Sequence, residues 1–334
     1  MSTITVPNPV PDTNEDCITL HKALEDFGCD KEALLNVICH RDQQQRQRIR
    51  HSYNRKYEED ILKTLKSKLH AKLEKGAVLW MCDPAERDAT ILHEALRCMS
   101  KDYSALTEVL YLRTSAELLD IRRAYSSRFG RSLEEELATK IDGSEKKLLL
   151  GLLREARSED DEIDTLQVEA DTKDLLSAIS NTKEVNKSVI IRVFTTRSSS
   201  HLRDVLDSFK TVHGYSFGKI LKSKTHGGFR VSVRVVMHCA KNLINYYAKT
   251  LYESMKGMGT DDSTLTRIIV TCAELNMKDI KAHFSRKYQR PLHEMISLDT
   301  MGHFQTFLML LVGVSRHEIH NGSFVKRLSS WSAS

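Results

Sequence analysis

The sequence lacks any long uninterrupted apolar run. Its most apolar segment, residues 304–314, is broken by Gln305, Thr306 and Gly313, whereas a helix that spans a bilayer needs about 18 or more consecutive apolar residues. The sequence therefore excludes an integral membrane protein of the helical type.

Paired cysteine motifs are also absent. The seven cysteines are an odd number, and none of them stands in a C-x-x-C pair. This argues against a disulfide framework and against a zinc ribbon. We expect most of the thiols to pack as small apolar side chains.

Proline and net charge are both scarce. Three of the five prolines lie in the first fifteen residues, which contain no basic apolar stretch, so this segment is interpreted as an extended tail and not as a secretory signal. A cytoplasmic protein is expected. The formal net charge is only +5, with Lys and Arg dispersed among acidic residues, so no nucleic-acid partner is predicted.

The strongest positive signal is an internal repeat. In the last quarter of the chain, eight apolar residues follow helical spacing. Subtracting 231, 159 or 75 from their numbers gives another apolar residue in twenty-three of twenty-four cases, His213 being the exception. Such agreement is not random in a chain that is 40% hydrophobic. The reference positions are Leu265, Ile268, Ile269, Ile280, Phe284, Tyr288, Leu292 and Ile296.

Four units of roughly 70 residues, each with about five short helices, follow from this pattern. We predict an all-α protein, with its two halves joined by an acidic linker between the second and third units. The predicted segments are a tail at 1–14, repeats at 15–85 and 86–157, the linker at 158–170, repeats at 171–243 and 244–316, and a tail at 317–334.

The fourth unit contains a loop suited to a hard cation. Its sequence from Met255 is M-K-G-M-G-T-D-D, and Asp299 follows Gly259 by forty residues in a second turn, D-T-M-G. Ca²⁺ takes six to eight oxygen ligands, and a glycine-bearing loop supplies carbonyl oxygens that a distant carboxylate completes. The alternative is that the glycines serve turn geometry only and that Asp299 caps a helix.

The fourfold repeat, the G-M-G-T-D-D loop and the D-T-x-G turn resemble the annexin family over residues 15–316. The segment D-P-A-E-R-D-A at 83–89 is similar to plant annexins in particular. The resemblance implies a slightly curved disc of four five-helix repeats that binds acidic phospholipid membranes peripherally when calcium rises. It also implies one Ca²⁺ held by the carbonyls of Met255, Gly257 and Gly259 and by both carboxylate oxygens of Asp299.

The other three units lack the acidic ligand. The repeat offsets carry Asp299 onto Lys68, Lys140 and Lys224, and an ammonium group repels Ca²⁺ instead of binding it. We predict one intact calcium site, in the fourth repeat. One hypothesis is that the lysines bind anionic headgroups without calcium; the other is that they are ordinary solvated loop residues.

Two loop-tip side chains are predicted to contact the membrane. Phe27 in the first repeat and Met258 in the fourth carry apolar atoms at positions that family membership would direct toward the lipid. Together with the three lysines, they complete the predicted membrane surface.

Catalytic chemistry is not indicated. No phosphate-binding G-x-x-x-x-G-K-[ST] loop, nucleophile elbow or H-E-x-x-H spacing occurs, so an enzyme is not predicted. His40 matches a histidine linked with peroxidase activity in plant annexins, but we interpret it as structural, since the sequence indicates no haem cavity. Cys239 matches one of a pair of plant-annexin cysteines, but its partner position is Tyr111.

Two further functions stay open as alternatives. The segment Ile191-Arg192-Val193 resembles a motif linked with actin binding, although Val193 is a core position of the repeat, so burial is expected. A calcium-insensitive scaffold for partners such as actin, or a membrane ion-conducting annexin, are the alternatives to calcium-dependent lipid binding. Oligomerisation on the membrane is left open.

Overall fold

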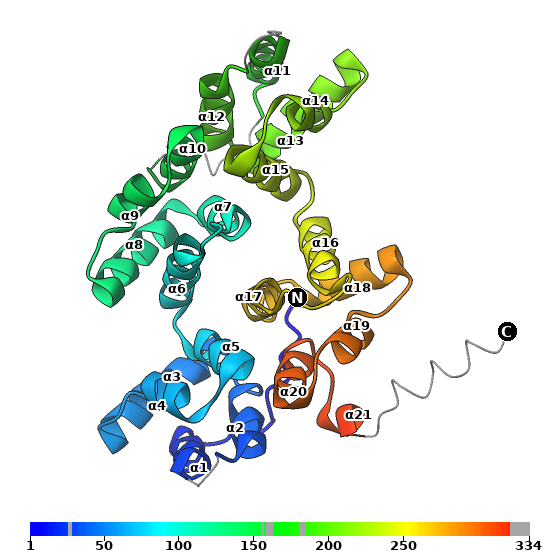
Figure 1. Ribbon diagram of the computed structural model, residues 1–334. Helices are drawn as coiled ribbons and strands as arrows, with labels where there is room; N and C mark the ends of the chain where they lie inside the picture. The colour runs from blue at the N-terminus through cyan, green and yellow to red at the C-terminus, as the bar shows by residue number, and fades with distance from the viewer. Residues whose placement is uncertain (26–28, 155–156, 158–162, 181–184, 321–334) are drawn as a thin grey trace, which may run out of the picture. The chain divides into compact units, whose positions relative to one another are not determined.

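The computed structural model describes residues 1–25, 29–154, 157, 163–180 and 185–320. Within these ranges it has twenty-one helices and no strand (Figure 1). The first twenty helices form four successive groups of five, which confirms the predicted all-α fold of four repeats.

The first two repeats contain ten helices. They are α1 (Thr13–Glu25), α2 (Lys31–Ile38), α3 (Gln43–Tyr57), α4 (Ile61–Lys68), α5 (Ala71–Met81), α6 (Pro84–Arg97), α7 (Tyr103–Leu112), α8 (Ser115–Phe129), α9 (Leu133–Lys140) and α10 (Gly143–Arg154).

The last two repeats contain ten more, and one short helix follows them. They are α11 (Thr165–Ser180), α12 (Lys187–Thr196), α13 (Ser199–His213), α14 (Phe217–Lys224), α15 (Gly227–Lys241), α16 (Leu243–Met255), α17 (Asp262–Cys272), α18 (Met277–Tyr288), α19 (Leu292–Asp299), α20 (Gly302–Leu311) and α21 (Arg316–His320).

The predicted acidic linker is shorter than 158–170. Helix α11 begins at Thr165, so residues 165–170 are helical. The carboxylate of Asp164 accepts hydrogen bonds from the backbone N–H groups of Leu166 and Gln167, at 2.9 and 3.2 Å. An aspartate that satisfies the first N–H groups in this way starts a helix, and the acidic character of the segment concealed this start.

The third helix of every repeat ends in the same conformation. The residue after each of these helices has a left-handed backbone, with φ of 55°, 68°, 74° and 53° at Glu58, Gly130, Gly214 and Gln289. A left-handed residue at this point closes the last helical turn and redirects the chain. The repeat is therefore preserved in backbone geometry even where glycine is replaced.

An aromatic ring on the third helix anchors the core of each repeat. Tyr53, Tyr125, Phe209 and Phe284 occupy equivalent positions, and all four are fully buried. In three repeats, a second aromatic ring lies one turn later on the third helix. It stacks against a ring on the first helix, with centroid distances of 3.6 to 4.0 Å. The stacked pairs are His21–Tyr57, His93–Phe129 and Tyr252–Tyr288.

The chain divides into two compact units that do not follow the predicted halves. One unit contains Met1–Asp83 and Ile244–Ser334, and the other contains Pro84–Leu243. Repeats 1 and 4 therefore pack together, as do repeats 2 and 3. The prediction of two halves joined at the acidic linker is wrong, because α12 packs on α10 and α15 packs on α7 across that linker.

A buried arginine links repeat 1 to repeat 4. The guanidinium of Arg46 stacks 3.5 Å above the ring of Trp80 and forms an ion pair at 2.7 Å with Glu274. Helix α5 also packs against α17 and α20. These contacts join segments from opposite ends of the sequence.

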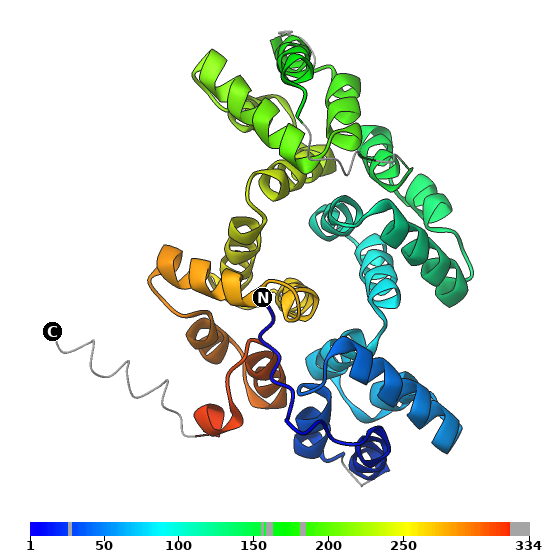
Figure 2. The same ribbon diagram turned by 180° about the vertical axis from the view of Figure 1, so that it is seen from behind.

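The N-terminal segment also lies against repeat 4. The backbone N–H of Thr3 donates to the carbonyl of Ala273 at 2.9 Å, and its hydroxyl donates to the carbonyl of Leu311 at 2.6 Å. Figure 2 shows the dark blue segment running beside the orange and red helices of that repeat. Gly313 permits this approach: its φ is +78°, and a Cβ there would lie 2.9 Å from the carbonyl oxygen of Thr3.

Candidate functional site

The first loop of the candidate site connects α16 to α17. Met255 is buried and ends α16, whereas residues 256–259 are exposed. Gly257 and Gly259 have φ of +112° and +91°, and no atom lies within 4 Å of a Cβ built on either. These glycines are therefore required for backbone conformation and not for close packing.

The base of this loop is closed by hydrogen bonds. The backbone N–H of Asp261 donates to the carbonyl of Ser254 at 2.8 Å. The Asp261 carboxylate in turn accepts a hydrogen bond from the N–H of Thr264 at 3.0 Å and caps α17. The loop is a short excursion between two fixed helix ends.

The second loop brings in Asp299, the last residue of α19. The hydroxyl of Thr260 lies 2.5 Å from an Asp299 carboxylate oxygen and 3.0 Å from the Asp299 carbonyl oxygen. One side chain thus links the glycine loop to the acidic residue forty positions later. Among the described residues, the Asp299 carboxylate forms no ion pair.

The oxygen donors of these two loops fit a hard cation. Main-chain carbonyls and one carboxylate are the ligand types that Ca²⁺ prefers. The two loops meet at Thr260, and the glycine loop is open to solvent. No group of three or more His, Cys, Asp or Glu side chains gathers as a metal site in the part of the chain that the structure describes, and a site made mainly of carbonyls needs none.

Exposed apolar side chains surround this pair of loops. Met258 is fully exposed at the tip of the first loop, as the sequence predicted for an apolar tip. Met301 in the second loop is 84% exposed, and Leu298 at the end of α19 is 57% exposed. Met301 was not among the membrane contacts predicted from the sequence. Its signal was the variable position of the D-T-x-G turn, which is occupied here by a large apolar residue. Phe27 lies outside the described residues.

The three lysines that replace Asp299 have different surroundings. Lys140 forms an ion pair at 2.8 Å with Glu136, one turn earlier on α9. The ammonium of Lys224 donates to the carbonyl of Ile179 at 2.6 Å. Lys68 is half-buried. Burial raises the pKa of the Cys29 thiol, and the charges of Lys31 and Lys68 oppose this rise.

Glu136 provides a negative counter-charge for Lys140 in the second repeat. Burial opposes its ionisation, but hydrogen bonds from Lys140 and Tyr125 lower the pKa of Glu136 to about 2. The carboxylate is therefore ionised at neutral pH. Lys140 thus has a fixed counter-charge on its own helix.

The remaining sequence candidates have structural surroundings. Nδ1 of His40 lies 3.0 Å from the Asn36 carbonyl oxygen, and burial lowers the pKa of this half-buried ring. Val193 is fully buried, which confirms its predicted core position. None of the seven cysteines forms a disulfide; Cys98 is exposed, and the others, including Cys239, are buried.

A buried ion pair recurs in three repeats and was missed in the sequence. It joins an aspartate on the first helix to an arginine that follows the second helix, at 2.6 Å in each repeat. The repeat offsets find the first two pairs and all three arginines, but Asp171 lies one residue before the position that the offset of 75 gives. The pairs are Asp16–Arg41, Asp88–Arg113 and Asp171–Arg197; in the fourth repeat, Tyr247 corresponds to Asp16 and Asp88, and Cys272 corresponds to the arginines.

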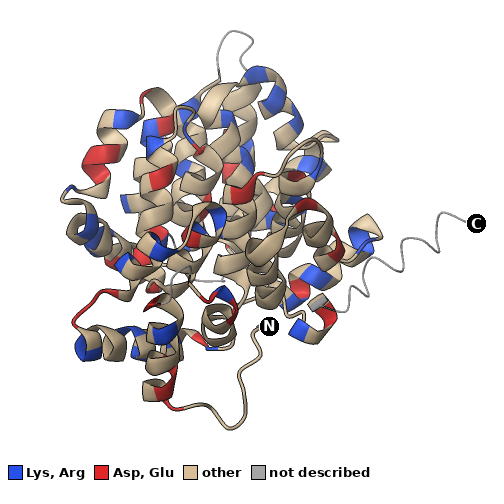
Figure 3. Ribbon diagram, turned by 60° about the horizontal axis from the view of Figure 1, so that its bottom comes forward, with Lys and Arg blue, Asp and Glu red and all other residues tan. Residues whose placement is uncertain are grey.

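Charged residues of both signs occur on many helices, as Figure 3 shows. Helices α4, α14 and α15 are among the exceptions, because they carry Lys and Arg but no Asp or Glu. In the described residues, no helix is both long enough and apolar enough to cross a bilayer.

Fold and loops together define a class: a protein of four five-helix repeats whose interhelical loops carry oxygen donors for a hard cation. The annexin family pattern matches residues 15–80, 87–152, 170–235 and 246–311. The chain belongs to the annexin family. The resemblance inferred from the sequence is thus confirmed, and calcium is the ion of this family.

The relatives include plant and animal annexins. Annexin D5 of Arabidopsis thaliana is 37% identical over 313 residues, which cover 94% of this chain and 99% of that protein. Annexin A13 of Mus musculus is 34% identical, with 90% and 95% covered. A solved structure of an annexin A8 mutant superimposes with a TM-score of 0.87 at 32% identity, covering 93% of this chain and 98% of the other.

Family membership sets the general activity. Annexins bind acidic phospholipid membranes in a calcium-dependent manner, and they are generally membrane-binding proteins and not enzymes.

Proposed function

We propose that this annexin binds acidic phospholipid membranes in the cytoplasm through a single calcium site in its fourth repeat. The observation that carries the proposal is the hydrogen bond from Thr260 to Asp299, which holds the glycine loop beside the one acidic ligand. When bound, Ca²⁺ would be held by the carbonyls of Met255, Gly257 and Gly259 and by the Asp299 carboxylate, and would bridge them to a lipid phosphate.

The chain's own residues make this site dependent on the membrane. One carboxylate and neutral carbonyls provide little negative charge, so calcium affinity stays low until lipid phosphate adds oxygens. Calcium and lipid affinities must then increase together, because coupling between two ligands is reciprocal. The exposed side chains of Met258 and Met301 add apolar contact with the interface.

Vesicle sedimentation tests this function. We expect the protein to sediment with phosphatidylserine vesicles in calcium and to stay in the supernatant with phosphatidylcholine vesicles. In calcium with phosphatidylserine, the calcium midpoint should fall as the lipid concentration rises. A midpoint independent of lipid would contradict the coupling, and equal sedimentation in chelator would contradict the calcium requirement.

The lysines of the first three repeats supply a weaker, calcium-independent attraction. A basic residue near an anionic surface contributes about 1 kcal/mol, or roughly five-fold in affinity. Lys140 is compensated by Glu136, so we expect Lys68→Gln to weaken binding in chelator more than Lys140→Gln does.

The measurement is sedimentation with phosphatidylserine vesicles at low salt in chelator. Lys63→Gln is the control, because Lys63 is exposed on the same helix as Lys68 but on another side of it. If a variant in which Lys68, Lys140 and Lys224 are all replaced by Gln binds as the wild type does, the lysines are ordinary solvated residues.

A further inference from the structure

A pocket of about 410 Å³ lies within the third repeat, between α13, α14 and α15. Its volume falls in the range of small-molecule sites. It belongs to the unit formed by residues 84–243, whereas the candidate calcium site belongs to the other unit. The pocket therefore needs an explanation of its own.

The inner wall of this pocket is apolar. Leu206, Phe217 and Leu221 are each 1% exposed, and Met237 is 8% exposed. Little of these side chains is exposed to water, so an alkyl chain in the pocket would gain mainly van der Waals contact with this wall.

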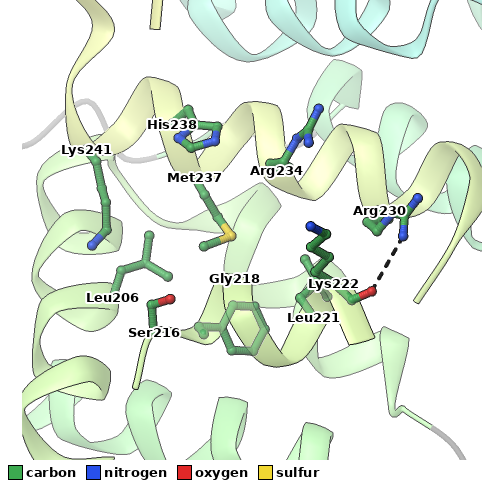
Figure 4. Close-up of a pocket in the computed structure, with 11 residues that line it drawn as sticks. Leu206, Ser216, Gly218, Leu221, Lys222, Arg230, Arg234, Met237, His238 and Lys241 are labelled. Carbon is green, nitrogen blue, oxygen red and sulfur yellow. Dashed lines mark hydrogen bonds between the residues drawn. The ribbon is translucent and has the colours of Figure 1, made fainter. Parts of the chain in front are cut away.

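The rim of the pocket is basic. Lys222, Arg230, Arg234 and Lys241 line it, and none of the lining residues that the structure describes is acidic. Figure 4 shows Lys241 at one end and Arg230 at the other, with Met237 between them. Lys241 forms an ion pair with Asp207 at 2.7 Å, whereas Arg234 forms no ion pair or hydrogen bond with the described residues.

The rim differs from the same surface in the other repeats. The positions equivalent to Arg234 hold Val78, Leu150 and Met309; the first and last of these are buried, whereas Arg234 is exposed. The third repeat thus carries an exposed cation where its counterparts carry apolar side chains. The packing of the repeat does not require an arginine at this position.

A glycine on α14 keeps the pocket open. Gly218 is helical, and a Cβ at this position would lie 3.0 Å from the terminal methyl of Met237. Glycine within a helix costs about 1 kcal/mol relative to alanine, and this residue has no left-handed backbone to justify it. The equivalent residues Leu62, Glu134 and His293 all have large side chains.

We propose that this pocket binds a single-chain lipid with a phosphate head, without calcium. The alkyl chain lies against Leu206, Phe217 and Met237, and the phosphate accepts charge-assisted hydrogen bonds from Arg230 and Arg234. Arginine suits this role because its planar donors match phosphate oxygens. A free phosphate would leave the apolar wall unused, and an uncharged lipid would leave the two arginines without an anionic partner.

Calorimetric titration in chelator separates these ligands. The probes are decanoyl lysophosphatidate below its micelle concentration, glycerol phosphate as the head alone, and monodecanoin as the uncharged lipid. We expect saturable one-site binding of the lysophosphatidate, with much weaker binding of the other two. Equal affinity for glycerol phosphate or for monodecanoin would overturn the proposal, and so would the absence of saturable binding.

Variants locate the ligand in this pocket. Arg230→Gln and Arg234→Gln should each weaken lysophosphatidate binding about ten-fold, as expected for a lost hydrogen bond to a charged group. Gly218→Leu should weaken it at least as much by filling the apolar part. Lys146→Gln, which changes the residue equivalent to Arg230 in the second repeat, is the control and should bind as the wild type does.

The two arginine variants keep the test decisive if Gly218→Leu does not fold, since Arg234 is exposed and Arg230 is half-buried at the rim. Circular dichroism establishes that each variant is folded. Unchanged binding in both arginine variants would place the ligand elsewhere and overturn the proposal.

Discussion

Replacing Asp299 with alanine is expected to abolish calcium-dependent sedimentation with phosphatidylserine vesicles at calcium concentrations that saturate the wild type. Asp299 is the acidic ligand of the proposed site, and Thr260 holds it against the glycine loop. Since the number of charged ligands tunes calcium affinity over several decades, we expect the calcium midpoint to rise on the order of a hundred-fold. A calcium titration at fixed lipid measures the midpoint.

Two further variants make this result specific to ligation. Asp299→Glu retains a carboxylate and should keep part of the calcium response, whereas Asp299→Asn should lose it. Asp142→Ala removes an exposed carboxylate from the corresponding loop of the second repeat and should leave the midpoint unchanged. An intact calcium dependence in Asp299→Ala would show that the site assignment is wrong.

Replacing Asp171 with alanine is expected to destabilise the unit formed by repeats 2 and 3 by about 3–5 kcal/mol. The Asp171 side chain is completely buried and accepts hydrogen bonds from Arg197 at 2.6 Å and from His201 at 3.1 Å. Arg192 also lies 3.4 Å from it. Alanine would leave Arg197 and His201, whose side chains are 25% and 8% exposed, without their shared acceptor. Urea unfolding followed by circular dichroism measures the loss.

The control is Asp174→Ala on the same helix. Asp174 also pairs with Arg192, at 2.6 Å, but its side chain is 52% exposed, so this variant should cost no more than about 1 kcal/mol. Equal shifts of the unfolding midpoint for the two variants would show that burial of the Asp171 network does not matter.

The Asp171 effect should also depend on pH. Burial opposes ionisation of this carboxyl, but hydrogen bonds and charge from Arg197 outweigh burial and lower its pKa below the ordinary value. A lowered folded-state pKa contributes stability that is fully present above the unfolded-state pKa, about 3.9, and is lost as the pH falls through the folded-state value. The difference between wild type and Asp171→Ala should therefore shrink below about pH 4.

Much of the fold followed from the sequence because apolar spacing is local. The offsets between repeats place Tyr53, Tyr125, Phe209 and Phe284 at equivalent positions, and burial of all four reflects that periodicity. The same offsets predicted which loop retains an acidic residue. The Asp299 variants test whether that loop binds calcium.

Contacts between distant segments were not predictable in the same way. The Arg46–Glu274 ion pair joins residues from repeats 1 and 4, and no spacing rule relates them. Some side-chain partners were not predicted either: Lys140 and Lys224 are equivalent in sequence, yet Lys140 pairs with Glu136 on its own helix, whereas Lys224 donates to the carbonyl of Ile179 on another helix. Such differences depend on neighbours that the periodic pattern does not specify.

The pairing of the first and last repeats has a consequence for biosynthesis. Residues 84–243 form a contiguous unit, whereas the other unit needs both Met1–Asp83 and the segment from Ile244 onward. Since a chain leaves the ribosome from its N-terminus at about 5–20 residues per second, the first repeat emerges early but finds its partner last. Until then, the surface of α5 stays without α17 and α20, which pack against it, and the middle of the chain is the part that completes first.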